Sequence, residues 1–168
     1  MQRVLIAGSS GAGKSTLAAK LASRCGLPYT ELDSLFHGPN WVPRREFLDE
    51  VARLAATDRW VTEWQYTAAR ALLLERADTL IWLDLRRFTV MHRVLRRSFR
   101  RAALHEPIFN ANTEGFRDWL DPTHPVRWAW TTHAALRPRV LAAIEQRPEL
   151  SVVRLRSPAA ARRWLASL

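Results

Sequence analysis

The feature that most constrains this chain is a glycine-rich stretch near its start, GSSGAGKST at residues 8–16. Its spacing fits the pattern G-x-x-x-x-G-K-[ST] without a mismatch. An apolar run precedes it at residues 4–7, and good helix formers follow at residues 17–22. Glycines allow successive N–H groups to point inward as a nest for an anion, and the start of a helix favours negative charge there. The pattern therefore predicts a strand, a phosphate-binding loop and a helix; the alternative is a flexible turn that contains a lysine by chance.

This loop predicts how a nucleoside triphosphate is held. We expect Lys14 to reach the β- and γ-phosphates, and the Ser15 hydroxyl to bind Mg²⁺. The predicted contacts of the triphosphate are Gly8, Ser9, Ser10, Gly11, Ala12, Gly13, Lys14, Ser15 and Thr16.

Length and cysteine content restrict the class of protein. A chain of 168 residues suits one domain, 1–168, with one hydrophobic core. No apolar stretch approaches the roughly 20 residues that a membrane helix needs, and the first residues enter a strand directly, without a signal peptide. Cys25 is the one cysteine, so we expect neither disulfides nor a thiolate metal site. These features predict a soluble, cytoplasmic protein that does not bind membranes. We expect a monomer or a homodimer, although these features do not decide between the two.

The net charge of +10 comes from arginine, because only Lys14 and Lys20 among the 26 basic residues are lysines. Arginine matches phosphate geometry bidentately, which suits phosphate chemistry. The alternative explanation of this arginine content is a preference for arginine codons throughout the genome. The stretch from Arg86 to Arg139 holds eleven arginines against four carboxylates, so the positive charge is concentrated in one half of the chain.

Apolar runs that alternate with helical patterns predict the fold. The runs lie at residues 4–7, 27–32, 60–63, 79–85 and 150–155, and a helical pattern covers residues 44–57. This alternation predicts an α/β fold with a five-stranded parallel sheet that helices cover on both faces. Because ligands of such sheets bind beyond the carboxyl ends of the strands, the phosphate loop, Asp33, residues 63–66 and residues 84–87 should share one crevice.

Several side chains of this crevice are candidates for the chemistry. Asp33 follows the second run, where its carboxylate can orient an acceptor hydroxyl or organise Mg²⁺; capping the helix that begins at Ser34 is the alternative. Asp84, in LIWLDL, can hold Mg²⁺ through water or cap the helix that starts near Arg87. The predicted acceptor-binding residues are Asp33, Trp41, Glu63, Trp64 and Tyr66; for the aromatic residues, ordinary packing is the alternative.

The arginine-rich half predicts a lid. Four arginines of DLRRFTVMHRVLRRSFRR share one helix face and can neutralise a transferring phosphoryl group, although a solvated basic face is the alternative. Residues 102–126 lack periodicity and are rich in proline, asparagine and glycine, which is typical of a lid or a binding loop. We therefore expect a lid over about residues 98–137. The four arginines are Arg93, Arg97, Arg100 and Arg101.

Taken together and in order, five stretches resemble the adenylate-kinase-like P-loop proteins often labelled topology modulation proteins. The stretches are VLIAGSSGAGKST, LDSLFHGPNWV, DRWVTEWQY, ERADTLIWLDL and RVLRRSFRR, and the likeness covers nearly the whole chain. The resemblance implies a P-loop NTPase three-layer sandwich with strand order 2-3-1-4-5, a mobile lid after the fourth strand, and ATP with Mg²⁺ as the phosphoryl donor.

The resemblance also implies roles for individual arginines. Arg93 would lie near the adenine, Arg97 on the phosphates, and Arg137 would close over the γ-phosphate. The loop that begins at Arg156 would pass the edge of the adenine. The chain departs from this group after the third run, where Glu63-Trp64-Gln65-Tyr66 replaces an Asp-Gly-Asn-Tyr type of sequence. A tryptophan in place of glycine fills space beside the acceptor, so the acceptors of relatives do not transfer to this chain.

These observations favour an ATP-dependent kinase for a small hydroxyl- or phosphate-bearing acceptor, with nucleosides and nucleotides among the candidates. In this hypothesis the catalytic residues are Lys14, Asp33, Arg97 and Arg137. A nucleic-acid-associated NTPase or regulator, whose arginines grip a phosphate backbone, is the less favoured hypothesis because the sequence holds no recognised nucleic-acid motif. A nucleotide-binding protein without turnover is the third.

Overall fold

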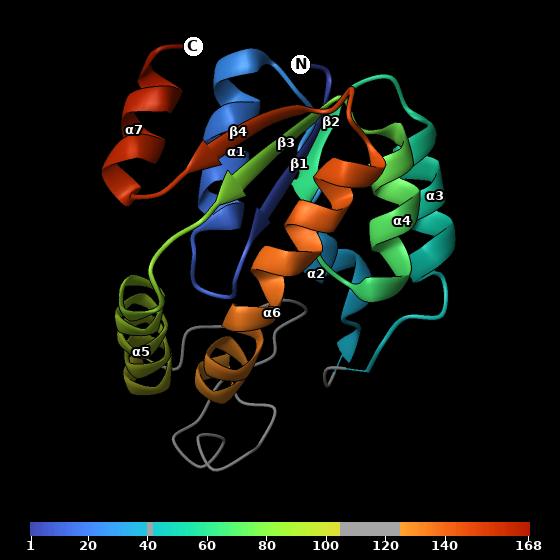
Figure 1. Ribbon diagram of the computed structural model, residues 1–168. Coiled ribbons are helices and arrows are strands. Elements are labelled where there is room, and N and C mark those ends of the chain that lie inside the picture. Colours follow the sequence, from blue (N-terminus) through green and yellow to red (C-terminus); the bar gives the residue numbers. More distant parts are fainter. Residues whose placement is uncertain (40–41, 105–124) are drawn as a thin grey trace.

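Four parallel strands form the centre of the structure, a computed structural model that describes residues 1–39, 42–104 and 125–168. Their order across the sheet is β2-β1-β3-β4 (Figure 1). In chain order the elements are β1 (Arg3–Gly8), α1 (Lys14–Cys25), α2 (Leu32–Phe36), α3 (Phe47–Ala56), β2 (Trp60–Glu63), α4 (Thr67–Arg76), β3 (Thr79–Leu83), α5 (Arg87–Leu104), α6 (Pro125–Gln146), β4 (Ser151–Leu155) and α7 (Pro158–Ala166).

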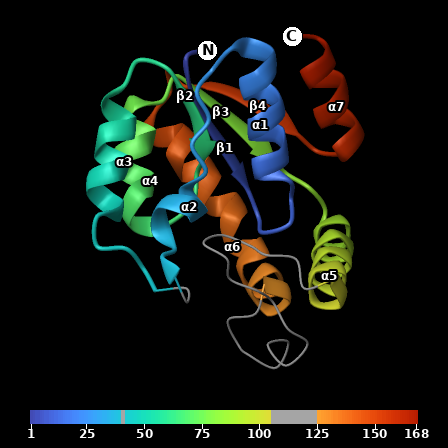
Figure 2. The same cartoon turned by 180° about the vertical axis from the view of Figure 1, so that it is seen from behind.

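Helices bury both faces of the sheet, as the continuous apolar strands predict. Along β1, Leu5 and Ala7 belong to a core shared with α3, α4 and α6. Val4 and Ile6 point to the other face and belong to a core shared with α1, α5 and α7. The result is a helix–sheet–helix arrangement, which can be followed from the two sides in Figure 1 and Figure 2.

The prediction of a fifth strand at residues 27–32 is wrong. This segment forms one isolated bridge to the sheet, between Tyr29 and Val61, and the helix α2 begins already at Leu32. Pro28 has no N–H to donate, and the N–H of Leu32 donates to the Glu63 carboxylate at 3.2 Å instead of to a strand. The sheet therefore has four strands and not five, and its order differs from the predicted 2-3-1-4-5.

The other predicted elements are present with small shifts at their ends. The predicted strand 60–63 is β2, and the helical pattern of residues 44–57 is α3, which is shorter at both ends. The runs at 79–85 and 150–155 correspond to β3 and β4. Among the described residues, no helix combines the length and the apolar character that crossing a bilayer requires.

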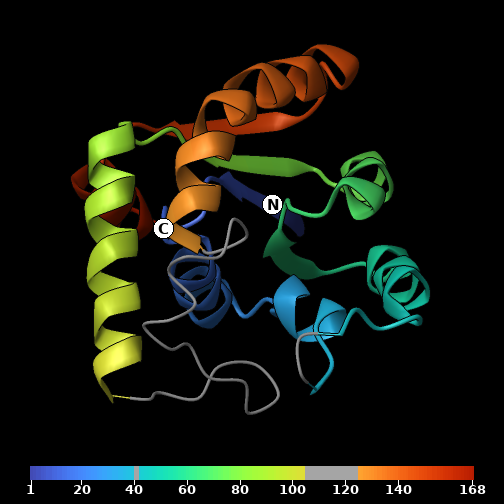
Figure 3. The same cartoon turned by 90° about the horizontal axis from the view of Figure 1, so that it is seen from below.

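Helix α5 and the first half of α6 lie beyond the carboxyl ends of the strands, while the second half of α6 packs against the sheet (Figure 1). Helix α5 follows β3, and the first half of α6 lies near it (Figure 1, Figure 3). The predicted lid at about residues 98–137 thus begins in α5 and ends in α6, while most of its irregular part, residues 102–126, is outside the described residues.

Candidate functional site

The phosphate loop has a backbone shape that requires glycine. It runs from the end of β1 to the start of α1, where Gly13 occupies the cap position with a φ of 96°. Gly11 has a φ of 79°, again in the left-handed region that favours glycine. A Cβ on Gly8 would lie 3.1 Å from the Cβ of Ala12 and 3.2 Å from the Cγ of Lys14. The loop thus bends tightly around the end of the strand, as a phosphate cradle must.

Helix α5 packs directly on this loop. A Cβ on Gly11 would meet Cγ2 of Val94 at 2.2 Å. Arg93, one position earlier, donates from Nη1 to the carbonyl oxygen of Ala12 at 2.9 Å. The structure therefore attaches Arg93 to the loop, on the helix that the sequence predicted to lie near the nucleotide.

Charged side chains from several elements act on the Lys14 ammonium group. Burial lowers the pKa of Lys14, the negative charges of Asp33 and Glu63 act against this shift, and the positive charges of Arg97 and Arg70 add to it. Three of these four residues were predicted to belong to the site. Arg70 was not predicted.

Tyr29 connects Ser15 with Glu63, the two residues near the loop whose side-chain oxygens could bind Mg²⁺. The Tyr29 hydroxyl donates to Oε1 of Glu63 at 2.7 Å, and the Glu63 side chain is buried. Burial and the Glu63 carboxylate raise the pKa of the Tyr29 hydroxyl well above its ordinary value, while a side-chain hydrogen bond with Ser15 lowers it slightly. Carboxylate and hydroxyl oxygens are the ligands that Mg²⁺ prefers, so the residues present fit the ion.

Asp33 is held by side chains from the loop after β2. Its Oδ1 accepts hydrogen bonds from Nε2 of Gln65 at 2.5 Å and from the Tyr66 hydroxyl at 2.6 Å. Asp33 lies within α2, whose cap position is Glu31, so the alternative of a helix cap does not describe its carboxylate. The carboxylate is instead held by these two side chains, and its negative charge acts on Lys14.

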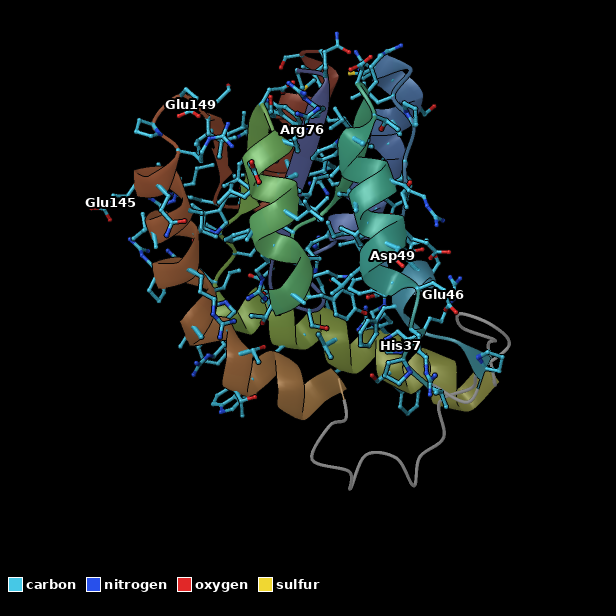
Figure 4. The ribbon with its side chains drawn as sticks, turned by 90° about the vertical axis from the view of Figure 1, so that its right-hand side faces the viewer. His37, Glu46, Asp49, Arg76, Glu145 and Glu149 are labelled. Atoms are coloured by element: carbon cyan, nitrogen blue, oxygen red, sulfur yellow. The ribbon has the colours of Figure 1, made fainter. Side chains whose placement is uncertain are left out.

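Tyr66 is the one non-glycine residue with a positive φ in the described part of the chain, at 58°. Its ring stacks on Phe36 at 4.2 Å between centroids, and its hydroxyl lies 3.2 Å from Nε2 of His37. Figure 4 shows His37 at the end of the molecule opposite to Arg76. Burial and the Asp33 charge raise the pKa of Tyr66 far above its ordinary value. Strained backbone that surrounding contacts hold in this way is typical of functional sites.

Trp64 lies in the core and not along the crevice. Its side chain is 5% exposed, and its Nε1 donates to the carbonyl oxygen of Arg70 at 3.2 Å. It packs with Ala69 and Leu73 in the core on the α4 face. The other predicted stacking residue, Trp41, is outside the described residues.

A second group of predicted residues lines a cavity of about 590 Å³ beyond β3 and β4. The Asp84 carboxylate, predicted to hold Mg²⁺ or to cap a helix, accepts from Nε of Arg154 at 2.9 Å, and Nη1 of Arg137 lies 3.9 Å from it. Within the described residues, no cluster of three or more acidic, histidine or cysteine side chains forms a ready metal site. The charged and polar lining residues are Ser9, Asp84, Arg86, His133, Arg137, Arg154 and Arg156.

Sequence reasoning missed Tyr29, Arg70 and Arg154. A signal existed for Arg154, a basic residue near the end of an apolar run at the predicted ligand edge. Tyr29 could have been found as a hydroxyl beside the predicted Asp33. Arg70 lies in a helical stretch of ordinary composition, and only the packing of α4 shows where it points.

Comparisons with known proteins identify the fold. No protein-family model and no curated protein sequence matches the chain. Among solved structures, a shikimate kinase from Acinetobacter baumannii in complex with shikimate has a TM-score of 0.60 at 15% identity, over 99% of this chain and 90% of that one. An unliganded sugar kinase from Janibacter sp. HTCC2649 has a TM-score of 0.53 at 20% identity, over 99% and 93%. A gluconokinase from Sinorhizobium meliloti 1021 has a TM-score of 0.48 at 18% identity, over 99% and 92%. At these identities the likeness to the shikimate kinase and to the sugar kinase shows a shared α/β fold alone, and it does not test the resemblance to topology modulation proteins.

Proposed function

We propose that this chain is an ATP-dependent kinase that transfers the γ-phosphoryl group to a small acceptor bearing a hydroxyl or phosphate group. The observation that carries the proposal is the position of Lys14 in the phosphate loop, under the influence of the carboxylates of Asp33 and Glu63. A phosphate cradle and a fixed carboxylate in one crevice are what phosphoryl transfer to a hydroxyl needs. The fold shared with solved small-molecule kinases supports this, as does the motif resemblance to adenylate-kinase-like proteins.

The phosphate loop performs the binding step. Its N–H groups and the start of α1 hold the phosphates, and Lys14 neutralises charge on the β- and γ-oxygens. Ser15 and Glu63, the latter through water, are the residues that would hold Mg²⁺, and Tyr29 positions the Glu63 carboxylate. When bound, the ion supplies charge neutralisation and orients the phosphate oxygens.

Asp33 performs the acceptor step. Its carboxylate orients the acceptor hydroxyl toward the γ-phosphate and takes the proton as the oxygen attacks. The hydrogen bonds from Gln65 and Tyr66 fix the carboxylate in one orientation, which removes the entropic cost of positioning it during the reaction. Because its pKa is raised, the Tyr66 hydroxyl remains a neutral donor to Asp33 at physiological pH.

The arginines of α5 and α6 stabilise the transferring group. We assign Arg93 to the nucleotide side of the phosphate loop, which its bond to Ala12 favours. Arg97 and Arg137 are assigned to the phosphates, and Arg156 to the base. In the structure Arg137 lies near Asp84, and its side chain is 61% exposed, so it can turn toward a phosphate at little cost. Asp84 then acts as the partner that keeps Arg154 oriented, and contact with Mg²⁺ through water remains its second assignment.

The test is a transfer screen with γ-labelled ATP over nucleosides, nucleotides, sugars and small hydroxy acids. The proposal predicts label transfer to one class of acceptor and only slow hydrolysis without an acceptor. Transfer to none of them, together with nucleic-acid binding whose affinity falls steeply with salt, would favour the nucleic-acid-associated NTPase instead.

A further inference from the structure

His37 lies just beyond the end of α2, one helical turn after Asp33 (Figure 4). Its backbone N–H donates to the carbonyl oxygen of Asp33 at 3.0 Å. Residues four positions apart lie on the same side of a helix, so the side chains of Asp33 and His37 share one side of α2. His37 also forms an isolated antiparallel bridge with Pro43. The backbone of His37 is therefore held relative to Asp33 by the residues before it and after it.

Tyr66 joins the side chains of Asp33 and His37. Its hydroxyl lies 2.6 Å from Oδ1 of Asp33 and 3.2 Å from Nε2 of His37. The Tyr66 ring stacks on Phe36 at 4.2 Å between centroids and meets Phe47 edge-on at 5.2 Å. His37 packs edge-on against the same Phe36 ring at 4.9 Å. These aromatic contacts keep the Tyr66 hydroxyl between the carboxylate and the imidazole.

The donors and acceptors of this group determine which ring nitrogen of His37 carries hydrogen. A hydroxyl has one hydrogen to donate, and an ionised carboxylate can only accept. Because the Tyr66 hydroxyl donates to Asp33, its contact with His37 is a hydrogen bond only if Nε2 carries hydrogen and donates to the Tyr66 oxygen. Donation then runs from His37 to Tyr66 and from Tyr66 to Asp33. Hydrogen bonds in such a chain polarise and strengthen one another.

The hydrogen bonds of the Asp33 side chain distinguish its two oxygens. Gln65 donates to Oδ1 at 2.5 Å, and Tyr66 donates to the same oxygen at 2.6 Å. Among the described residues, none donates a hydrogen bond to Oδ2. Oδ2 is therefore the oxygen that can receive the hydroxyl of an acceptor.

We infer that His37 is a positioning residue for phosphoryl transfer, which acts through Tyr66 to hold Asp33 with Oδ2 toward the acceptor. The inference rests on the proposed function, in which Asp33 orients the acceptor. In the transfer step the hydroxyl proton of the acceptor moves to Oδ2, the acceptor oxygen bonds to the γ-phosphorus, and the bond from that phosphorus to ADP breaks. His37 and Tyr66 keep their own protons throughout. The alternative role of His37 is packing against Phe36, which needs neither the Nε2 hydrogen nor the Tyr66 hydroxyl.

The first arm of the test is a double-mutant cycle in the labelled-ATP assay, with the acceptor that the transfer screen identifies. His37→Leu removes the donor and should lower kcat about five- to tenfold, as loss of one hydrogen bond predicts, without changing the KM of ATP. His37→Gln should retain most of the rate, because its amide can donate from the position of Nε2. Tyr66→Phe should also lower kcat, and adding His37→Leu to it should change kcat less than about twofold. His92→Leu, at an exposed position on α5, is the control.

The second arm needs no acceptor. Long-range proton–nitrogen NMR correlation distinguishes a protonated ring nitrogen from an unprotonated one. In the neutral ring of His37 we expect the hydrogen on Nε2, and we expect Tyr66→Phe to shift the Nε2–H resonance because its acceptor is lost. This arm uses the wild-type protein and Tyr66→Phe, so it remains informative where His37→Leu folds poorly.

The outcomes separate this inference from the kinase proposal. A hydrogen on Nδ1 in place of Nε2, an unchanged kcat in His37→Leu, or an equal loss from His37→Leu with and without the Tyr66 hydroxyl overturns the inference and leaves the kinase proposal standing. Absence of transfer to every acceptor of the screen contradicts the kinase proposal, and the role of His37 in transfer fails with it.

Discussion

The Asp33 carboxylate accepts its two hydrogen bonds from Gln65 and Tyr66, which lie more than thirty residues further along the chain. The prediction for Asp33 assumed that residues 27–32 form a strand of the sheet, whereas the structure has no strand there and Asp33 lies within α2. Its partners could not be predicted, because the orientation of Tyr66 depends on a positive φ and on stacking against Phe36. Side-chain orientation also explains the error at Trp64. The sequence predicted that Trp64 lines the acceptor site, whereas its side chain is buried in the core.

The first prediction concerns Asp33→Asn. Asparagine keeps the size and can still accept a hydrogen bond from Tyr66, but it cannot take a proton. ATP affinity should stay within about twofold, and transfer should fall about 10²-fold or more, the scale of a lost general base. Titration calorimetry and the labelled-ATP assay measure the two quantities. Asp49→Asn, at an exposed position in the first turn of α3, is the control (Figure 4). Unchanged transfer in Asp33→Asn would show that another group orients the acceptor.

At the scale of elements, the phosphate loop and its flanking strand and helix were predictable because one local pattern specifies all three. The strand expected at residues 27–32 was not realised, because Pro28 lacks a donor and Glu63 diverts the N–H of Leu32. Pro28 is visible in the sequence, but the contact with Glu63 involves the neighbouring strand, and periodicity within a segment gives no information about its partner. The contact of α5 with the loop could not be predicted either, since it joins Gly11 to Val94 across 83 positions.

The second prediction tests this contact. Gly11→Ala should lower the free energy of unfolding by about 2–5 kcal/mol, because alanine is strained at the left-handed φ and its Cβ meets Val94. Gly26→Ala is the control: its φ of 62° is also left-handed, but nothing lies within 4 Å of the added Cβ, so about 1–2 kcal/mol is expected. Urea unfolding measures both. In a double-mutant cycle, Val94→Ala should recover part of the loss in Gly11→Ala. Equal costs at the two glycines would show that the steric contact is absent.

At the scale of the molecule, the positive charge and the proposed triphosphate site occupy the same end. Helix α5 and the first half of α6 lie beyond the carboxyl edge, and the two helices carry Arg93, Arg97 and Arg137 (Figure 3). Because these arginines carry like charges, we expect them to repel one another until an anion arrives. ATP binding should therefore shift the protein toward a conformation in which α5 and α6 lie closer to the phosphate loop. The size of the shift is set by how much more tightly that conformation binds ATP.

The third prediction follows from this arrangement. In hydrogen exchange, a non-hydrolysable ATP analogue with Mg²⁺ should increase protection in the phosphate loop and also in α5 and the first half of α6. Helix α3 is the internal control in this experiment. It lies on the proposed acceptor side, so its protection from exchange should change little. Protection limited to residues 8–16 would mean that the arginine-rich half does not cover the nucleotide, and the nucleic-acid-associated alternative would regain support.

The central claim is that Lys14 holds the phosphates of a nucleotide whose γ-phosphoryl group this chain transfers. It is tested most directly by comparing Lys14→Met with Lys20→Met, the exposed lysine of α1, in the labelled-ATP transfer assay at saturating acceptor. The account predicts that Lys14→Met loses transfer by about 10²–10³-fold or more, as expected when a fixed charge at the reacting group is removed, while Lys20→Met retains it. Equal transfer by the two variants would contradict the account.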